Sequence, residues 1–429
     1  MKILFRDLMT LLPEGARRTC VGVEGRRIAF VGDRVPDDFR PDRTVTGENY
    51  VLSPGFINAH THLPMTLLRG VADDRPLQEW LFQEIFPRED RLNDEVVTVG
   101  TEIALAESLA SGVTSVSDMY FFSSAIVAAV DRCGIKANIA RSLTSYEEGK
   151  DRHTDRRMLE QAALYRDWNG ADDGRILVDE SVHALYVSDP TVWRDAADIA
   201  REQGMIFHVH VSETRNENEE CLQKYGKTPT AALAGCGVFD SRVLAAHGVW
   251  LTDEDVEIYR SHGAVIAHCP VSNAKLASGI APVCKYRDAG LRMALGTDGA
   301  SSNNSLSMLG EMKQACLMAK ILTEDARALT AGECFRMATA GGAYAQGREH
   351  ECGEIREGMD ADLVLLDFSR PNLQPLRDPV SSLVYAADPS NVAMTMVRGR
   401  VLYEHGEFTT IDMERLRREA VRASLSLEA

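Results

Sequence analysis

The chain has 429 residues, and 64 acidic side chains against 47 lysines and arginines give it a formal net charge of −17. This excess of acidic residues argues against binding to nucleic acid or to an anionic membrane, because both attract basic surfaces. No apolar run approaches the length of about 20 residues that spans a bilayer. Arg6 and Asp7 interrupt the apolar N-terminal stretch, which argues against a signal peptide. The nine cysteines include no Cys-x-x-Cys pair, which indicates a soluble protein of the reducing cytoplasm.

Short strands and turns are predicted over residues 1–50. From residue 51 onwards, apolar β-branched runs alternate with helical patterns such as 94–112, 190–204 and 251–263. Alternating strands and helices indicate a parallel sheet, and eight such units are what a (β/α)8 TIM barrel requires; an open sheet of seven or nine strands fits the same pattern. The eight runs are residues 51–62, 112–120, 135–144, 175–185, 205–213, 243–249, 264–273 and 292–300.

Both ends of the chain have a different pattern from the middle. Residues 355–410 return to short β runs, and the chain finishes in an amphipathic helical pattern from Asp412. Neither end is long enough for a comfortable core of its own, since small domains bury too little surface. We therefore expect an α/β protein in which residues 51–349 form the barrel, while residues 1–50 and 350–429 pair into one small β-sandwich domain.

The histidines are the most informative residues. Residues i and i+2 of a strand point to the same side, so His60 and His62 present two imidazoles together. The carboxyl ends of barrel strands carry the active site, and imidazole and carboxylate groups are the ligands of catalytic zinc. Asp298, in the eighth run, and a histidine of the fifth run would complete such a site. Seven of the 11 histidines lie in or at the end of predicted strands: His60, His62, His183, His208, His210, His247 and His268.

The fifth run offers two candidate ligands, His208 and His210. We favour His210 because it lies nearer the carboxyl end of its strand, and we assign His208 and His268 to the barrel interior. The resulting set predicts a metal-dependent catalytic barrel with a divalent ion, most simply Zn²⁺, although Fe²⁺, Mn²⁺ and Ni²⁺ accept the same ligands. A single strand histidine is more often a hydrogen-bonded core residue, so the prediction depends on the whole set occurring in order.

Five motifs occur in this order: PGFINAHTHLPMTLLRG, HVHVSETRNE, AAHGVWL, AHCPVSNAKLASGIAPV and GTDGASSNNSLSM. Together they resemble the amidohydrolase superfamily, and within it the branch of 5-methylthioadenosine/S-adenosylhomocysteine deaminases and the related triazine chlorohydrolases. The resemblance covers about residues 1–410 and implies a (β/α)8 barrel with a β-sandwich made from both termini. Relatives are often multimeric, so a homo-oligomer is compatible with it.

The resemblance also implies a role for individual residues. The metal ligands would be His60, His62, His210 and Asp298. The fourth run has no lysine that could bridge two metals, so one ion per chain is expected. His247 would orient the attacking water, and Glu213 would shuttle a proton at the ring nitrogen. Glu89 would contact the ribose of the substrate, and His183 would contact the purine. Arg141 would bind the amino-acid tail of an adenosylhomocysteine-type substrate. Arg152 is the candidate for a second arginine at that tail, although the segment around it matches the family poorly.

Each of these roles has a structural alternative. Glu213 could only support His210, Glu89 could be a solvated helix start, and Arg141 could pair with an acidic neighbour such as Asp118. We nevertheless expect a hydrolase acting on C–N bonds in cyclic amidines: a metal-dependent deaminase of 5-methylthioadenosine, S-adenosylhomocysteine, 5′-deoxyadenosine or adenosine. The alternatives are a deaminase or chlorohydrolase of a triazine, guanine or pterin, and a barrel without catalytic activity.

Overall fold

The computed structural model describes residues 1–428, and its centre is a closed barrel of parallel strands. Strands β9 and β10 occupy one barrel position, because β9 pairs with β8, β10 pairs with β11, and only Asp179 separates the two. The barrel closes where the backbone N–H of Asp298 donates to the carbonyl of His60 at 3.0 Å. The strands are β6 (Phe56–Thr61), β7 (Val113–Tyr120), β8 (Lys136–Arg141), β9 (Ile176–Val178), β10 (Glu180–Ser181), β11 (Phe207–Val211), β12 (Val243–His247), β13 (Val265–His268) and β14 (Arg292–Leu295).

This closure confirms the expected TIM-barrel type of fold and excludes the open sheet. The first predicted run, residues 51–62, is in fact two strands that separate at Gly55. Its first half is β5 (Tyr50–Pro54), which leaves the barrel and pairs with β1 and β15. A Cβ at position 55 would lie 2.1 Å from the Thr114 hydroxyl, so the chain needs glycine where it passes between the two sheets.

Helices cover the outside of the barrel, and their ends follow the expected local signals. Helix α7 begins after Asp189, whose side chain accepts from the backbone of Thr191, and stops at Gly204 in the left-handed conformation. Helix α10 begins with a reciprocal capping pair, Thr252 and Asp255. The main covering helices are α3 (Asp94–Ala110), α4 (Ser123–Cys133), α5 (Arg156–Trp168), α7 (Pro190–Gln203), α8 (Arg215–Tyr225), α10 (Asp253–His262), α12 (Val283–Asp288), α14 (Met308–Thr323), α15 (Ala331–Met337) and α16 (Ala340–Ala345).

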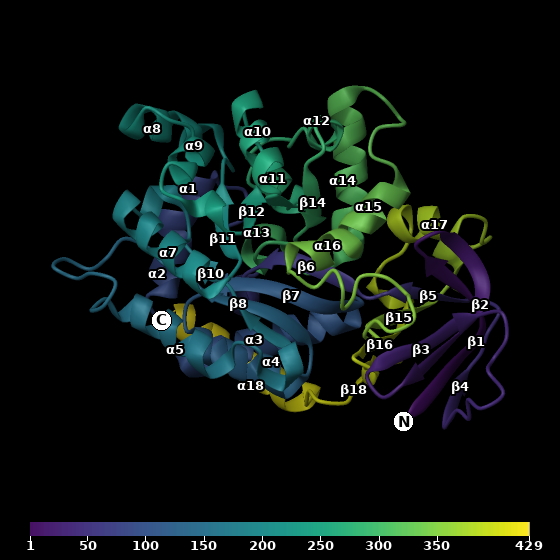
Figure 1. Cartoon of the computed structure of the whole chain (residues 1–429). Helices are drawn as coiled ribbons and strands as arrows, with labels where there is room; N and C mark the ends of the chain where they lie inside the picture. The colour runs from purple at the N-terminus through teal and green to yellow at the C-terminus, as the bar shows by residue number, and fades with distance from the viewer. Residues whose placement is uncertain (429) are drawn as a thin grey trace.

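The two ends of the chain pair into one nine-stranded sheet beside the barrel, with the order β18-β17-β16-β15-β5-β1-β2-β3 and β4 next to β1 (Figure 1). An apolar cluster that includes Phe5, Leu52, Leu365 and Met394 joins strands from both ends. The strands are β1 (Lys2–Leu12), β2 (Gly15–Glu24), β3 (Arg27–Gly32), β4 (Arg43–Val45), β15 (Leu363–Asp367), β16 (Val392–Val397), β17 (Arg400–Glu404) and β18 (Glu407–Phe408).

The last helix, α18 (Met413–Glu428), leaves this sheet and packs on the barrel helix α3. Arg415 of α18 pairs with Glu102 of α3 at 2.5 Å, and Arg91 donates to the carbonyl of Leu427 at 2.7 Å. Figure 1 accordingly places the N-terminus at the terminal sheet and the C-terminus near α5. The C-terminal segment therefore covers the barrel as well as extending the sheet.

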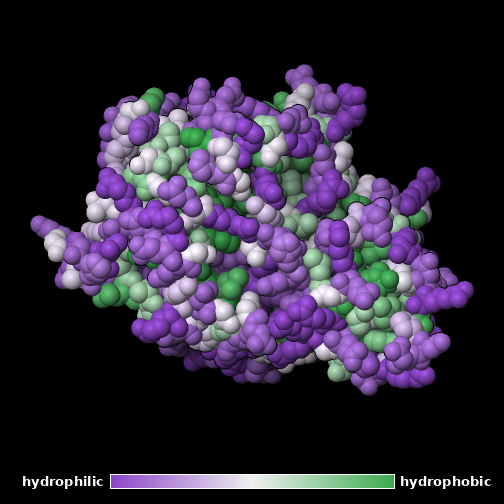
Figure 2. Space-filling model, viewed as in Figure 1, coloured by the Kyte–Doolittle hydropathy of each residue, from purple (hydrophilic) through white to green (hydrophobic). Residues whose placement is uncertain are grey.

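The outer surface is mainly polar. Figure 2 shows one face on which hydrophilic residues dominate and apolar residues form small, separate areas. Among residues 1–428, no helix combines the length and the apolar character that crossing a membrane would need.

Candidate metal centre and active site

The candidate ligands meet at the carboxyl end of the barrel. His60 lies in β6, His62 follows that strand directly, and His210 lies in β11. His247 ends β12, beside β11 in register, and Asp298 follows β14 by three residues. His247 and Asp298 have positive φ values of 75° and 63°, so both side chains are displayed at sharp backbone turns.

The strands can approach this closely only because of a glycine. A Cβ at Gly296, in the GTDG motif, would lie 2.8 Å from the Cβ of His60. Any larger residue would therefore push β14 away from β6 and separate Asp298 from the two histidines of the first strand.

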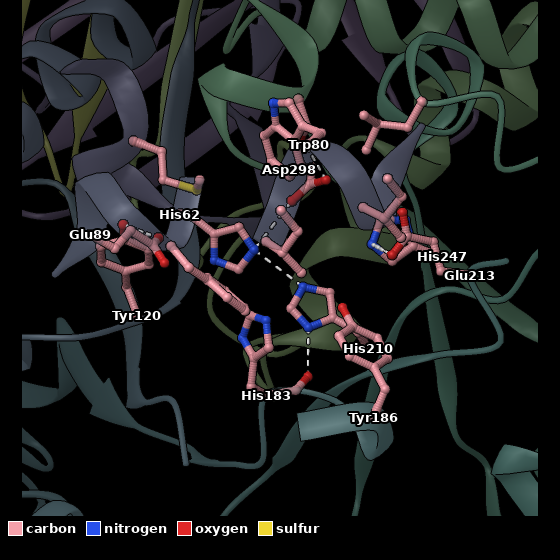
Figure 3. Close-up of a pocket in the computed structure, with 16 residues that line it drawn as sticks. His62, Trp80, Glu89, Tyr120, His183, Tyr186, His210, Glu213, His247 and Asp298 are labelled. Carbon is pink, nitrogen blue, oxygen red and sulfur yellow. Dashed lines mark hydrogen bonds and ion pairs between the residues drawn. The ribbon is translucent and has the colours of Figure 1, made fainter. Parts of the chain in front are cut away.

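Five donors converge on one point, and Figure 3 shows four of them, His62, His210, His247 and Asp298. One ligand atom from each of His60, His210, His247 and Asp298 lies within 4.8 Å of the others. His62 reaches the same point, since its Nε2 is 3.1 Å from Nε2 of His210 and 3.2 Å from Oδ1 of Asp298. The structure thus brings together the four expected ligands, with His247 as a fifth donor next to them.

The hydrogen bonds at the back of the rings determine where their lone pairs point. Nδ1 of His62 donates to the carbonyl of Met119 and Nδ1 of His210 donates to the carbonyl of His183, both at 2.6 Å. A carbonyl can only accept, so each neutral ring keeps its lone pair on Nε2. Two such lone pairs facing each other at 3.1 Å beside a carboxylate repel unless a cation lies between them.

His60 completes this arrangement. Its Nε2 is buried without a hydrogen-bond partner and lies 3.4 Å from Oδ1 of Asp298. Burial lowers the pKa of His60 to about 4, and burial together with neighbouring imidazoles holds the pKa of His210 well below its usual range. Neutral imidazoles are the form that binds metals, so this donor set fits a divalent cation.

Asp298 is held as a carboxylate. Burial would raise its pKa, but the imidazoles of His60 and His62, whose Nε2 atoms lie 3.4 and 3.2 Å from Oδ1, outweigh burial and keep the pKa well below the usual value. The second oxygen, Oδ2, accepts from the hydroxyls of Ser272 at 2.6 Å and Ser302 at 2.8 Å. These two serines leave Oδ1 free to face the histidines.

Glu213 and His247 form a second functional pair beside the ligands. Oε2 of Glu213 lies 3.7 Å from Nε2 of His247, and Oε1 accepts from the Ser278 hydroxyl at 3.2 Å. Nδ1 of His247 donates to Oδ1 of Asn273 at 2.8 Å, and the backbone N–H of Glu213 is held by Glu217 at 2.7 Å. Burial raises the pKa of Glu213, so its carboxyl group can hold a proton closer to neutral pH.

Glu89 and His183 line the same cavity: Glu89 lies across it from Glu213 and His247, and the His183 ring lies beside that of His210, with 4.8 Å between the ring centroids (Figure 3). Glu89 ends the short helix α2 (Phe86–Glu89), and the Tyr120 hydroxyl donates to its Oε1. Burial raises the pKa of Glu89 to about 7 and lowers that of His183 to about 3. Sequence reasoning did not single out Tyr120, although an aromatic residue at the carboxyl end of the second barrel run was a usable signal.

Neither of the two arginines expected at the substrate is among the lining residues found within the described chain. The Arg141 side chain is 5% exposed and its Nε donates to Oε2 of Glu160 at 2.9 Å. The acidic partner is therefore Glu160 rather than Asp118, which instead accepts from the backbone N–H of Leu63 at 2.6 Å. Nε of Arg152 lies 3.2 Å from Nε2 of His153 on an exposed loop.

The remaining wall of the cavity is apolar. Much of it comes from one segment between β6 and α3, which consists of α1 (Leu77–Glu79), the π-helix η2 (Trp80–Ile85) and α2. Residues 144–158 are not among the lining residues found in the part of the chain that the structure describes. The main apolar lining residues are Met65, Leu77, Trp80, Leu81, Phe86 and Leu276.

A family comparison agrees with this site. The sequence model of the Amidohydrolase family matches residues 51–402. The chain belongs to the amidohydrolase family. Among curated relatives of this amidohydrolase, the 5-methylthioadenosine/S-adenosylhomocysteine deaminase of Pelotomaculum thermopropionicum is 43% identical over 418 residues, which are 97% of this chain and 95% of the relative. These matches confirm the resemblance that the five motifs suggested.

Solved structures are similar over almost the whole chain. The crystal structure of an adenosine deaminase from Xanthomonas campestris with bound zinc has a TM-score of 0.93 and 34% identity, and the match covers 99% of this chain and 98% of that one. Atrazine chlorohydrolase from Arthrobacter aurescens, complexed with zinc, has a TM-score of 0.90 and 24% identity over 98% of this chain and 100% of that one. The second likeness shows the fold alone.

Proposed function

We propose that this amidohydrolase catalyses the metal-dependent hydrolytic deamination of adenosine-like nucleosides, releasing ammonia and the inosine analogue. The observation that carries the proposal is the convergence of inward-facing imidazole lone pairs and the Asp298 carboxylate beside the Glu213–His247 pair. The relative in Pelotomaculum and the adenosine deaminase in Xanthomonas support an adenosine-like substrate, such as 5-methylthioadenosine, S-adenosylhomocysteine, 5′-deoxyadenosine or adenosine.

One divalent ion, Zn²⁺, is assigned to His60, His62, His210 and Asp298. The zinc in the Xanthomonas structure supports this choice of metal. Catalytic zinc keeps one position for water and can take five ligands in all, so at most four of the five donors are metal ligands and one has a different task. His247 is the one that also faces Glu213, at 3.7 Å, and we therefore assign it to the attacking water rather than to the metal.

The reaction needs a nucleophile, an acceptor for its proton and a donor for the ring. The ion, when bound, would lower the pKa of a water molecule to about 7. Asp298 takes one proton of the attacking water, and Nε2 of His247, whose Nδ1 proton is donated to Asn273, accepts a hydrogen bond from the other. Attack at the amino-bearing carbon moves electrons onto the adjacent ring nitrogen, to which Glu213 delivers a proton. Asp298 then gives its proton to the amino group, the C–N bond breaks and ammonia leaves, while the hydroxyl of the intermediate becomes the carbonyl and its proton returns to Glu213. The raised pKa of Glu213 suits its task as proton donor, because a carboxyl group protonated near neutral pH is an effective acid.

Glu89 and His183 are proposed to position the nucleoside. An ionised Glu89 accepts hydrogen bonds from the ribose hydroxyls, with Tyr120 fixing the carboxylate from behind. His183, whose Nδ1 lies 3.1 Å from the Ser142 hydroxyl, contacts the purine. Residues 51–349 would then form the catalytic domain, with residues 1–50 and 350–429 as the accessory β-sandwich.

The cavity is narrow in the present conformation, with about 40 Å³ of space for water-sized groups. The covering segment α1–η2–α2 carries much of the apolar wall and includes a π-helix, a geometry that is frequent at functional sites. We therefore propose that this segment moves outward to admit substrate. The net charge of −17 supports a free small molecule rather than nucleic acid as the substrate. The nine cysteines, all free, support a cytoplasmic location.

Turnover and metal content together test the proposal. The purified protein would be analysed for zinc and then incubated with 5-methylthioadenosine, 5′-deoxyadenosine, adenosine, guanine and an amino-triazine, with ammonia as the readout. We expect close to one metal per chain and ammonia from the adenosine-like compounds. If only guanine or the triazine released ammonia, the substrate would be another amino-heterocycle and not a nucleoside. If the protein neither contained metal nor took it up, the barrel would lack this activity.

A further inference from the structure

The covering segment α1–η2–α2 is linked internally by ion pairs. Glu84 of η2 pairs with Arg75, just before α1, at 3.1 Å and with Arg88 of α2 at 2.8 Å. Two of its side chains, Trp80 and Glu89, line the cavity (Figure 3). If the segment moves outward to admit substrate, we expect it to move as one body. Its polar contacts with the rest of the described chain lie at its two ends.

The two ends are held by different kinds of contact. At the end that leads to α3, Tyr120 donates to Glu89, and Arg91 donates to a backbone carbonyl of α18 at 2.7 Å. At the other end, Oδ1 of Asp73 lies 2.7 Å from Nζ of Lys275. Within residues 1–428, this is the one ion pair that joins residues 71–92 to the rest of the chain.

Lys275 is presented from an element that is fixed to the active site. It ends the short helix α11 (Pro270–Lys275), which follows β13. In this helix, the Ser272 hydroxyl donates to Asp298 at 2.6 Å, and Asn273 accepts from His247 at 2.8 Å. Because α11 is tied to two residues of the rim, Lys275 is the stationary partner of its ion pair and the covering segment carries the partner that moves.

The ammonium group of Lys275 is held in place by two further contacts. Nζ donates to the carbonyl of Ser301 at 2.9 Å and to Oδ1 of Asn304 at 3.0 Å. Both acceptors belong to the turn around α13 (Ala300–Asn303), directly after the rim carboxylate Asp298. An ammonium group has three donors, so two of them fix it to the rim and the third is directed at Asp73. Of these three acceptors, only Asp73 neutralises the positive charge.

The turn that carries Asp73 has a strained backbone. Gly70, Ala72 and Asp74 have positive φ values of 73°, 57° and 64°. Such values cost free energy in residues with a Cβ, above all in alanine, and they persist where contacts of the surrounding structure hold them. Asp73 lies between the two non-glycine residues of this kind, so its ion pair with Lys275 stabilises the closed form of the turn.

We infer that Lys275 is a positioning residue whose ion pair with Asp73 holds the covering segment closed over the bound nucleoside. The inference rests on the proposed function and on the outward movement proposed with it. The Lys275 side chain is 21% exposed and that of Asp73 is 40% exposed, so opening replaces the pair by hydration at little cost and the pair can form again in each catalytic cycle. Lys275 is not among the cavity-lining residues found in the described chain, so it influences substrate binding only through the segment.

Hydrogen exchange tests the ion pair without any substrate. The backbone amides of residues 71–92 would be followed in the purified enzyme and in Lys275→Met, which removes the ammonium group at similar side-chain volume. We expect exchange in this stretch to be about fivefold faster in Lys275→Met, the upper end for a partly exposed ion pair, with no change in α7. A change of less than about twofold would overturn the inference. Equally faster exchange in residues 270–278 would also overturn it, because Lys275 would then hold the rim and not the segment.

Kinetics tests the effect on the reaction, with 5-methylthioadenosine as substrate. KM should rise by about fivefold in Asp73→Asn and in Lys275→Met and no further in the double variant, while kcat stays within about twofold. High salt should raise the KM of the unmodified enzyme but not that of the double variant. Asp74→Asn is the matched control, because the Asp74 carboxylate forms no ion pair within residues 1–428. A lower kcat at an unchanged KM in Lys275→Met, or the same rise of KM in Asp74→Asn, would overturn the inference. Absence of turnover in the unmodified enzyme would overturn the proposed function, and hydrogen exchange alone would then decide on the ion pair.

Discussion

Charged side chains are buried at both ends of the barrel, at the rim that holds the candidate metal centre and at the end that meets the terminal sheet. At the sheet end, Lys136 begins β8 and is 1% exposed, with Nζ 2.6 Å from Asp362 and 2.8 Å from Asp360. Burial alone would lower the pKa of Lys136, but the two aspartates raise it above its ordinary value. Every charge in this group therefore has a partner from the protein itself.

The rim is built differently. His62 and His210 direct their lone pairs at each other, and Nε2 of His60 is buried without any partner. An unpaired buried polar group costs stability, so a set of them in one place indicates a ligand that the protein does not itself supply. The comparison teaches that buried charge alone does not identify a functional site, whereas several buried ligand atoms that converge on one point without protein partners do.

Removing a ligand from the rim should have the largest effect. Asp298→Ala deletes both a metal ligand and the proposed acceptor of the water proton, so we expect turnover to become undetectable and the zinc content to fall. The exposed Asp288→Ala, paired only with Arg287 at the surface, is the control and should retain both. Substantial turnover by a metal-loaded Asp298→Ala enzyme would contradict the role given to the rim carboxylate.

Glu213→Gln tests the rim without touching the metal. The amide cannot deliver the proton that the ring nitrogen needs, so kcat should fall by about 10²–10⁴-fold, the usual contribution of a positioned acid. Zinc content should stay that of the unmodified enzyme, because Glu213 contacts Ser278 and His247 rather than the assigned ligands. A near-normal kcat would mean that another group protonates the substrate.

Much of the rim was predictable, because its signals are local. The two-residue spacing of His60 and His62, the alternation of strands and helices, and the carboxyl-end position of His210, His247 and Asp298 are all readable along the chain. The remaining features depend on long-range packing. Nothing near Arg141 indicates that Glu160, 19 residues later, would occupy it. Likewise, the break at Gly55 looks like the middle of one strand until the second sheet is present to take β5.

Lys136→Met should have the opposite profile from the rim substitutions. It leaves Asp360 and Asp362 buried without their cation, and breaking a buried pair of this kind typically costs about 3–5 kcal/mol. We expect the urea midpoint of unfolding to fall accordingly, while kcat and zinc content of the folded fraction remain unchanged. Lys285→Met, at an exposed pair with Asp253, should change the midpoint little. If the Lys136→Met protein lost zinc while its urea midpoint stayed unchanged, Lys136 would contribute to metal binding and not to stability, and the proposed difference between the two ends of the barrel would be wrong.

The smallest effect is expected from substitution of His208, which lies between the metal centre and the interior of the barrel. Its Nε2 lies 2.9 Å from Nδ1 of His60, and its own Nδ1 is buried without a partner. Accepting this bond would keep the proton of His60 on Nδ1 and its lone pair on Nε2, toward the metal.

His208→Ala should therefore weaken zinc binding by about 10–100-fold, the usual result of losing such support, as measured by competition with a chelator. His208→Gln offers a side-chain carbonyl in the same place and should recover part of the affinity. His268→Ala is the control, because His268 is also buried but its Nδ1 has no hydrogen-bond partner within residues 1–428. Unchanged zinc affinity in His208→Ala would place His208 with the self-sufficient interior of the barrel rather than with the metal centre.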